Sequence, residues 1–340
     1  MDTELARRLD RPLEIGGRTI AGRLVLAPMT DLGHPAFREL LDGFGGCGLL
    51  FSEMCSARRL PAENPAHSRC FRWREAERSR LVFQIVGGEA EAMAAAARRI
   101  EAEGFFGVDL NFGCSVQAIC RRDGGAALLR DPGRAAAVVE AVRRAVDCPV
   151  TVKFRTGWQD DPAPAVAMAR RLEAAGADAL TFHPRTAPDR RTRPPRWDYI
   201  RAVKEAVRIP VFGNGNVFSA ADCHRMLATT GCDGVAVGRM AIARPWLFAE
   251  WTAGLLPDAD IHRRTALRHI ALLGEHFEPV RALRRFRRFA TYFAANLRFG
   301  HTFCRRLARA ADLSAAADVV EDFFREPPEL LSAPNLNLFH

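Results

Sequence analysis

Short apolar runs recur along the first 240 residues, and each ends in glycine, proline or a polar residue. Between them lie alanine-rich stretches with apolar residues at helical spacing, such as EAEAMAAAARRIEAEG, and most of these stretches close on glycine. Continuous apolarity within a run is typical of strands that helices cover on the outside and side chains fill within. The runs predict eight strands, at residues 23–28, 48–53, 81–86, 107–112, 149–154, 178–183, 210–214 and 233–238.

Strands that alternate with helices pair in parallel through right-handed crossovers, which favours an α/β fold of the (β/α)8 TIM-barrel type. An open doubly wound sheet is the alternative, but it normally carries a glycine-rich turn after an early strand, and the GNGN at 213–216 lacks the third spaced glycine. LEIGGRTI, at 13–20, predicts a hairpin that could close the barrel floor. We therefore expect a barrel domain over 1–254.

The strand rhythm stops after residue 251, and the rest of the chain shows helical patterns only. We expect helices at 262–275, 279–298, 302–311 and 314–325, which together form an all-helical C-terminal domain over 255–340. A length of 340 residues suits one barrel of about 250 residues and a smaller domain.

Several function classes are disfavoured by composition. No apolar stretch approaches the roughly 20 residues of a membrane span, and the N-terminus is too charged for a signal peptide, so we expect a cytoplasmic protein, and a monomer. The nine cysteines include no C-x-x-C pair, which argues against a disulfide framework and against a metal site.

A net charge of +9 favours a polyanionic partner, although arginine bias and a merely solubilising surface would give the same value. The loop at 184–196 is basic, and residues 281–309 contain no acidic residue. Helical spacing places four arginines on one face of that segment, Arg281, Arg284, Arg285 and Arg288. The opposite stripe is apolar, with Leu283, Phe286, Ala290, Phe293 and Leu297. A solvated arginine-rich helix is the alternative.

Catalytic groups of such barrels lie at the carboxyl ends of the strands. Lys153 stands late in a buried strand and needs an anionic partner, either a bound flavin or an internal carboxylate of Glu53 or Asp109. Cys114 follows the fourth strand on a glycine-bent loop, where it is either a general acid or a buried structural thiol. The glycines at 213–216 and 238–241 are either a phosphate site or ordinary tight turns.

The ordered motifs of the chain resemble those of the tRNA-dihydrouridine synthase family. They are LAPMTDLGHPAFREL, FQIVGGEAE, VDLNFGC with DGGAALLRDP, TVKFRTGW, HPRT with RWDYI, and GNGN with GCDGVAVGRMAIARPWLF. The resemblance implies an FMN-bound barrel that takes hydride from NADPH and reduces the C5=C6 bond of a uridine in tRNA. It also implies that the helical domain binds the tRNA.

Carried over by position, the resemblance makes Cys114 the proton donor and places Asn111 and Arg185 against the uracil. It assigns the FMN contacts to Pro28, Met29, Thr30, Gln84, Lys153, His183, Asn214, Gly215, Asn216, Gly238 and Arg239.

The chain departs from the family pattern at four positions in these motifs. Ser115 replaces the usual proline after the cysteine, Asn216 replaces aspartate, Met240 replaces glycine, and Pro184 stands where glycine is usual. Two alternatives therefore stay open: a flavin barrel that reduces a small molecule, and a divergent RNA-binding paralogue without turnover.

Overall fold

Eight parallel strands close a barrel in the computed structural model, which describes residues 3–189 and 193–339. Around the barrel the order is β3-β11-β10-β9-β8-β7-β6-β4. The strands span Leu24–Leu26 (β3), Leu50–Phe51 (β4), Leu81–Val86 (β6), Gly107–Phe112 (β7), Val150–Gly157 (β8), Ala179–Thr186 (β9), Val211–Asn214 (β10) and Gly234–Val237 (β11). All eight predicted strands are confirmed, and so is the TIM-barrel fold.

The two ends of this order meet, which makes the sheet a barrel. Val25 and Leu49 form a parallel bridge, and the N–H of Leu26 donates to the carbonyl of Leu49 at 3.0 Å. A short additional strand, β5 (Cys55–Ser56), pairs with β6 beyond the end of β4. Closure leaves no unpaired sheet edge along this seam.

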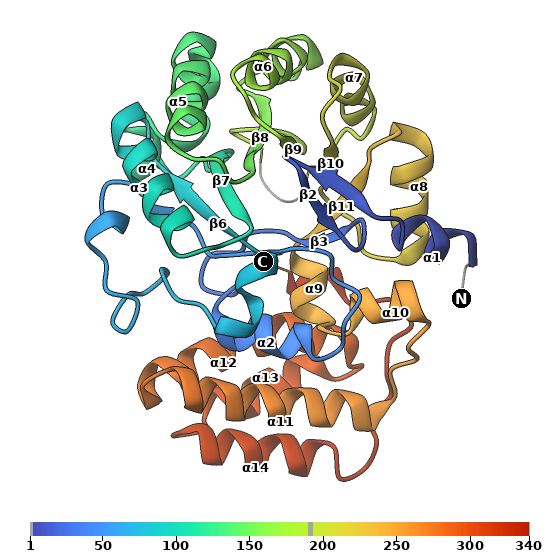
Figure 1. The fold of residues 1–340 in the computed structure, drawn as a ribbon. Helices are drawn as coiled ribbons and strands as arrows, with labels where there is room; N and C mark the ends of the chain where they lie inside the picture. Colours follow the sequence, from blue (N-terminus) through green and yellow to red (C-terminus); the bar gives the residue numbers. More distant parts are fainter. Residues whose placement is uncertain (1–2, 190–192, 340) are drawn as a thin grey trace. The chain divides into compact units, whose positions relative to one another are not determined.

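Five helices stand around the outside of the barrel (Figure 1). They are α3 (Ala90–Ala102), α5 (Pro132–Ala145), α6 (Pro162–Ala174), α7 (Asp198–Ala206) and α8 (Ala220–Thr230). Three of them begin at side chains that accept a hydrogen bond from a first-turn N–H, namely Asp131, Asp161 and Ser219. The alanine-rich pattern that predicts these helices therefore acts together with specific start signals.

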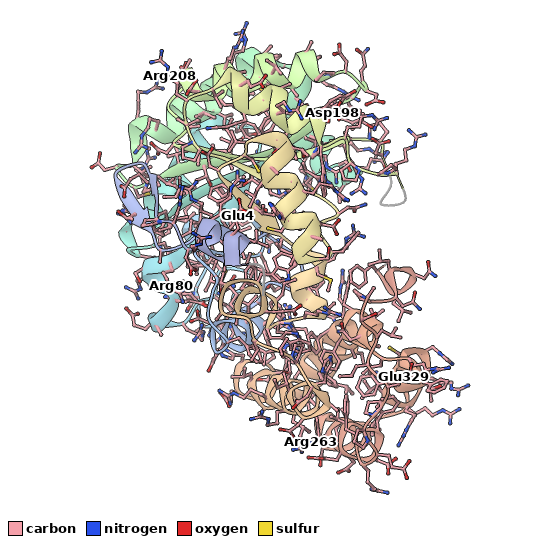
Figure 2. The ribbon with its side chains drawn as sticks, turned by 90° about the vertical axis from the view of Figure 1, so that its right-hand side faces the viewer. Glu4, Arg80, Asp198, Arg208, Arg263 and Glu329 are labelled. Atoms are coloured by element: carbon pink, nitrogen blue, oxygen red, sulfur yellow. The ribbon has the colours of Figure 1, made fainter. Side chains whose placement is uncertain are left out.

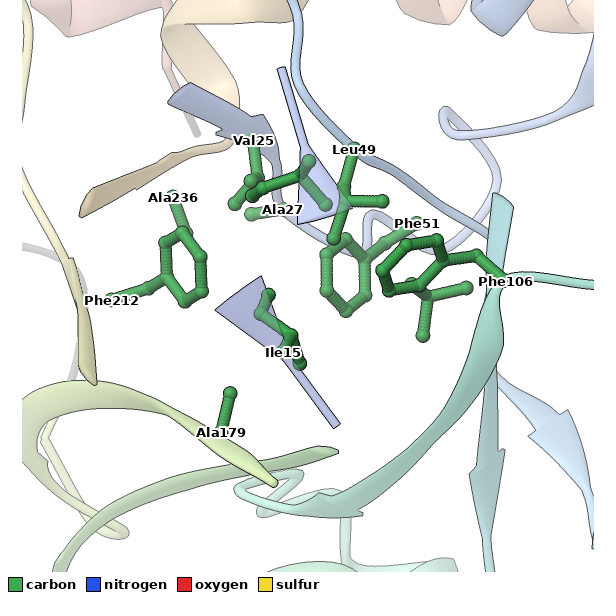
Figure 3. Packing of buried hydrophobic residues seen from close by; sticks show 11 residues of the cluster. Ile15, Val25, Ala27, Leu49, Phe51, Phe106, Ala179, Phe212 and Ala236 are labelled. Atoms are coloured by element: carbon green, nitrogen blue, oxygen red, sulfur yellow. The ribbon is translucent and has the colours of Figure 1, made fainter. Parts of the chain in front are cut away.

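The predicted hairpin is present and fills the amino-terminal end of the barrel. Strands β1 (Leu13–Ile15) and β2 (Arg18–Ile20) are antiparallel, and Ile15 and Ile20 are buried. Figure 3 shows the cluster that they complete with Val25, Ala27, Leu49, Phe51, Val82, Phe106, Ala179, Phe212 and Ala236. Gly16 is required in the turn, because its φ is +53° and a Cβ there would lie 2.8 Å from Cγ of Asp178.

Acidic side chains tie the strands together at this same end. The N–H of Val150 donates to Asp178 at 2.7 Å, and the N–H of Val211 donates to Asp233 at 2.8 Å. Asp233 also forms an ion pair with Lys204, with 2.7 Å between Nζ and Oδ2. Val150 and Val211 are the first residues of β8 and β10, so these bonds satisfy the N–H group with which each strand begins. They fix the amino-terminal end of the barrel.

Contacts divide the chain into two compact units. Residues Arg7–Pro28 and Gly48–Val237 hold the whole barrel, and Met1–Ala6, Met29–Cys47 and Gly238–His340 form the second unit. Three stretches before residue 254, at 1–6, 29–47 and 238–253, thus group with the C-terminal helices by contacts. The functional division at residue 254 stays a prediction.

The second unit is helical. Its helices are α2 (Pro35–Asp42), α9 (Arg239–Ala243), α10 (Leu247–Ala253), α11 (Ala259–His276), α12 (Pro279–Phe293), α13 (Gly300–Ala308) and α14 (Leu313–Phe323). The predicted helix over 279–298 ends earlier, at Phe293, because a 3₁₀ turn at Ala294–Asn296 follows and Leu297 then bridges to Leu330. The apolar stripe predicted for this segment is buried throughout.

Charged side chains cover the outside of both units, as Figure 2 shows. In the helical unit, Arg263 forms ion pairs with Asp260 and Glu321, both at 3.0 Å. Within the described ranges, no helix combines the length and the apolarity that crossing a bilayer requires.

An unusual histidine lies in the core of the helical unit. His269 is fully buried, and its ring lies 4.2 Å from that of Phe289 and 6.1 Å from that of Phe37. Neither ring nitrogen has a hydrogen-bond partner among the described residues. Burial lowers the pKa of His269 to about 3, so the ring stays neutral at physiological pH.

We expect His269→Leu to stabilise the protein, because leucine removes two unsatisfied polar atoms. The free energy of unfolding in urea should rise by about 1 kcal/mol at pH 7.5. Since the folded-state pKa of about 3 lies below the ordinary value of 6.5, the unfolded chain binds more protons between these values, and stability falls as pH falls. The advantage of leucine should therefore grow by about 2 kcal/mol at pH 5.

The matched control is His301→Leu, which changes an exposed histidine of the same unit. Equal effects of the two substitutions at both pH values would contradict the assignment of the acid sensitivity to His269.

Candidate active site

Polar side chains gather at the carboxyl ends of adjacent strands in the barrel unit. The strand register places Gln84 of β6 beside Asp109 of β7. It places Asn111 of β7 beside Lys153 of β8, and Arg155 of β8 beside His183 of β9. These are the strand ends at which a barrel of this class carries its chemistry.

A chain of hydrogen bonds links the barrel interior to the loop after β7. Thr151 donates its hydroxyl to Asp109 Oδ1 at 2.6 Å, and Gln84 Nε2 donates to Asp109 Oδ2 at 2.6 Å. Gln84 Oε1 then accepts from Asn111 Nδ2 at 2.8 Å. Burial raises the pKa of Asp109 to about 6, against hydrogen bonds from Thr151 and Gln84 and the charge of Lys153, all of which lower it. Asp109 is therefore mostly ionised at neutral pH.

Cys114 lies at the end of this chain, on the loop that follows β7. Asn111 Oδ1 accepts from the N–H of Gly113 at 3.1 Å and from the N–H of Cys114 at 2.8 Å. The carbonyl of Cys114 accepts from the N–H of Ala126 at 2.8 Å. Gly125 is required beside it, because a Cβ there would lie 2.5 Å from that carbonyl oxygen. The sequence motif DGGAALLRDP thus holds the cysteine loop from the other side.

The thiol of Cys114 is half-buried, and burial raises its pKa above the ordinary value. The nearby charges of Arg155 and Lys153 act in the opposite direction and lower it. The thiol is therefore protonated at neutral pH, and two cations stand close enough to stabilise the thiolate that proton donation would leave. Such a group can serve as a general acid.

Lys153 is half-buried in β8, and its ammonium has no ion pair or hydrogen bond among the described residues. The pKa of Lys153 is lowered to about 8, mainly by burial. The charge of Arg155 also lowers this pKa, while Asp109 and Cys114 raise it. The sequence leaves open an internal ion pair of Lys153 with Glu53 or Asp109. Among the described residues, Lys153 forms neither pair. The chain has 49 lysine and arginine residues, of which only Lys153 and Lys204 are lysines. Lys204 lies in α7 and pairs with Asp233 at the amino-terminal end of the barrel.

Arg185 is buried and organises the end of β9. Its Nη1 lies 3.1 Å from His183 Nε2, and its Nη2 donates to Asn216 Oδ1 at 3.1 Å. Its Nε donates to the carbonyl of Arg193 at 2.6 Å. Because a guanidinium only donates, Nε2 of His183 accepts, and the neutral ring carries its proton on Nδ1. Arg185 thus holds His183 and the turn after β10 in one arrangement.

The GNGN turn after β10 is built around close approaches. A Cβ at Gly215 would lie 2.9 Å from Cδ2 of His183, and the carbonyl of Gly215 accepts from the indole of Trp197 at 2.9 Å. Asn216 adopts a positive φ of 52°. Asn214 Nδ2 donates to the carbonyl of Ala236 at 2.7 Å, so one side-chain N–H of Asn214 ties β10 to β11.

The predicted contacts Met29, Thr30, Gly238 and Arg239 belong to the helical unit, whereas Pro28 is the last residue of a barrel segment. The carbonyl of Met29 accepts from the N–H of Gly33 at 2.7 Å, and Gly238 precedes α9. Arg239 donates to the carbonyl of Phe339 at 3.4 Å. The structure describes these residues in a different unit from Gln84, Lys153 and His183.

The arginine face predicted for α12 is only partly exposed. Arg284 and Arg288 are exposed and Arg281 is half-buried, as the spacing suggests. Arg285 is buried instead: its Nη1 donates to the carbonyl of Asp31 at 3.1 Å, and its guanidinium lies 4.6 Å from the ring of Phe277. Arg288 forms an ion pair with the carboxylate of Asp31 at 3.1 Å. The shared exposed face is therefore smaller than helical spacing predicts.

Three positions that depart from the family pattern lie in different surroundings. Ser115 is exposed on the cysteine loop, and Pro184 is buried within β9, where its carbonyl accepts from the N–H of Arg196 at 3.0 Å. Met240 is buried in the helical unit, with 1% of its surface exposed. Part of the basic loop at 184–196, residues 190–192, lies outside the described residues.

Two features of the site are not predicted by sequence reasoning. Asp109 and Thr151 form the buried start of the hydrogen-bond chain, and Arg130 stacks 3.6 Å from the ring of Trp158, whose indole donates to Ala126. The sequence does carry a signal for the hydrogen-bond chain, because Asp109 and Asn111 are two residues apart in one strand and so point to the same face. Nothing in the spacing of Arg130 and Trp158 indicates the second.

Taken together, the closed barrel and the polar groups at its strand ends define a (β/α)8-barrel enzyme. The model of the dihydrouridine synthase family matches residues 25–327, so it spans both contact units. The chain belongs to the dihydrouridine synthase family, and it is an oxidoreductase.

Relatives agree along most of their length. The chain is 36% identical over 321 residues to tRNA-dihydrouridine synthase B of Pseudomonas putida, covering 92% of this chain and 95% of that protein. It is also 36% identical over 320 residues to a probable tRNA-dihydrouridine synthase of Mycobacterium tuberculosis, covering 87% of this chain and 80% of that protein.

Solved structures share the fold at low sequence identity. A 2-naphthoyl-CoA reductase complex matches with a TM-score of 0.57 at 15% identity, covering 73% of this chain and 52% of that one. Morphinone reductase in complex with tetrahydroNAD matches with a TM-score of 0.51 at 17% identity, covering 72% and 90%.

We expect the amine of Lys153 to titrate with a pKa of about 8, because burial disfavours its charged form. Reductive methylation with ¹³C-formaldehyde labels only the two lysines and the N-terminal amine, so each NMR signal can be followed against pH. Lys153→Met and Lys204→Met assign the two lysine signals. A Lys153 signal that titrates near the ordinary value of about 10.4 would show that the ammonium is well solvated.

Proposed function

We propose that this enzyme reduces the C5=C6 bond of a uracil base in tRNA, with FMN as its flavin, NADPH as reductant and Cys114 as the acid. The observation that carries this is a half-buried ammonium, Lys153, without a counterion among the described residues and close to a protonated thiol. The first group suits an anionic cofactor, and the second suits protonation of a substrate carbon. Membership of the dihydrouridine synthase family supports the choice of uracil.

The residues at the strand ends fit a flavin. Lys153 would stand against the negative charge of the reduced ring, and Gln84 keeps one of its two amide hydrogens beyond the bond to Asp109. The Gly213–Asn216 turn brings backbone close to His183, where a side chain at Gly215 would clash, so this turn suits phosphate binding through backbone N–H groups.

The remaining assignments rest on the resemblance. Pro28 is assigned to the flavin together with Met29, Thr30, Gly238 and Arg239 of the helical unit. Asn214 would contribute mainly through its backbone, because its side chain binds the carbonyl of Ala236.

Reduced FMN would supply a hydride to C6 of the uracil ring. Cys114 Sγ would give its proton to C5, and the resulting thiolate would be stabilised by the charges of Arg155 and Lys153. Asn111 holds the loop through its Oδ1, which accepts the N–H groups of Gly113 and Cys114. Arg185, which binds His183 and Asn216, would act on the base mainly by positioning these two groups.

We expect Cys114→Ala to stop dihydrouridine formation while leaving oxidation of NADPH by the bound flavin intact, because only the proton donor is removed. Mass spectrometry of tRNA incubated with protein, FMN and NADPH measures the gain of two hydrogens. The matched control is Cys120→Ala, which removes the thiol at the end of the short helix α4 (Gln117–Cys120), a thiol that donates to the carbonyl of Cys114 at 3.5 Å.

Four outcomes would count against the proposal. Protein that cannot be loaded with FMN excludes the flavin, and Cys114→Ala with full dihydrouridine formation excludes the thiol. Turnover of free uracil or an enone with no action on tRNA would favour a small-molecule reductase. Salt-dependent tRNA binding without any dihydrouridine would favour a non-catalytic RNA-binding protein.

The exposed arginines of α12 support tRNA as the substrate. We propose that Arg281, Arg284 and Arg288 contact phosphates, whereas the buried Arg285 shapes the helix surface through Asp31 and Phe277.

We expect Arg284→Ala to reduce the slope of log affinity for tRNA against log salt concentration by about 1, because one phosphate contact is lost. Arg264→Ala is the control, since Arg264 is an exposed arginine of α11 that already pairs with Asp260 at 2.8 Å. Filter binding over a range of salt concentrations measures both slopes. Equal slopes for Arg284→Ala and the unmodified protein would remove Arg284 from the interface.

A further inference from the structure

Each hydrogen bond between Asp109 and the cysteine loop has a defined donor and a defined acceptor, so the chain of bonds has a direction. A carboxylate only accepts, so Gln84 must present Nε2 to Asp109 Oδ2 and Oε1 to its other neighbour. Asn111 must then present Nδ2 to Gln84 and Oδ1 to the loop. Each of these amides could rotate by half a turn without changing its volume. The orientation is fixed from both ends, by the carboxylate of Asp109 and by the two loop N–H groups that Asn111 Oδ1 accepts.

The direction matters at the far end of the chain. Both groups that face Asn111 from the loop are donors, the N–H groups of Gly113 and Cys114. If Asn111 were reversed, its NH₂ would meet two N–H groups, and both loop bonds would be lost. The reversed arrangement is open only when Gln84 no longer has to donate to residue 109.

The residue after the cysteine leaves the loop backbone free to rotate. Ser115 stands directly after Cys114, and it is exposed. Serine keeps its backbone N–H and a wider range of φ than proline, so this loop depends more on the bonds at Gly113 and Cys114. The bond from Ala126 to the carbonyl of Cys114 holds only the other side of the residue.

We infer that Asp109 is a positioning residue, whose carboxylate fixes the Asp109–Gln84–Asn111 hydrogen-bond chain from the barrel side and thereby holds the loop at residues 113–114. Asp109 acts on the loop through two amides and touches no reacting atom. The inference rests on the proposed function only in its consequence for catalysis, which requires that Cys114 is the acid. The bonding itself is testable without turnover.

The test is hydrogen exchange at the backbone N–H groups of Gly113 and Cys114 in the full chain at pH 7.5. Asp109→Asn keeps the shape but replaces the charged acceptor by an amide that can present either its oxygen or its NH₂ to Gln84. The direction of the chain is then held by the loop N–H groups alone, and the bonds at the loop are weaker. Exchange at both positions should become about ten-fold faster or more. The N–H of Val108, which donates to the carbonyl of Pro149 at 2.9 Å, reports on the intact strand and should not change.

Two further variants separate direction from simple packing. Thr151→Val removes only the donor to the other carboxylate oxygen, so exchange at Gly113 and Cys114 should stay as in the unmodified protein. The double variant Asp109→Asn with Gln84→Glu moves the carboxylate one place along the chain. The carboxylate introduced at position 84 accepts from the amide introduced at position 109 and from Asn111 Nδ2, so the direction is restored and protection of the loop should return.

Unchanged exchange in Asp109→Asn, or no recovery in the double variant, would overturn the inference. If Asp109→Asn does not fold, Gln84→Met breaks the chain while keeping Asp109, and the same loss of protection at Gly113 and Cys114 is expected. Dihydrouridine formation is measured separately, so an Asp109→Asn enzyme that modifies tRNA and keeps a fully protected loop would refute this inference and leave the proposed function standing.

Discussion

The need to keep the ammonium of Lys153, in the middle of β8, partly out of water constrains the rest of the site. Lys153 has lost part of its hydration, and the described residues provide no counterion for it. Asp109 lies close enough to raise the pKa of Lys153, yet both oxygens of Asp109 are taken by Thr151 and Gln84. The positive charge is therefore left for a ligand, and the carboxylate is left to organise its neighbours.

Much of the fold could be predicted because the information is local and repeated. Each strand and each helix carries its own apolar pattern, and the Gly16–Gly17 turn marks the hairpin directly. The end of α12 at Phe293 could not be predicted, because the helical pattern continues while a bridge between Leu297 and Leu330 decides the backbone. A contact so distant in sequence leaves no periodic signal.

The candidate site was predicted less completely, for a similar reason. Residue types in the strands single out Gln84, Asn111, Lys153 and His183, which lie on four adjacent strands, and the register places Asn111 directly beside Lys153. The partners of their polar atoms depend on three-dimensional geometry, as with the bond from Asn214 to Ala236. Arg285 shows the same limit: helical spacing groups it with three other arginines, while a loop carbonyl and an aromatic ring bury it.

The hairpin of β1 and β2 has a consequence for how this barrel tolerates change. Ile15 and Ile20 occupy volume that strand side chains would otherwise fill, and the strands opposite them carry small residues at Ala179 and Ala236. The side chains of the hairpin and of the strands therefore fill one common volume. A larger residue in the strands would need a smaller one in the hairpin, and removing the hairpin would expose the apolar cluster that includes Phe212 to water.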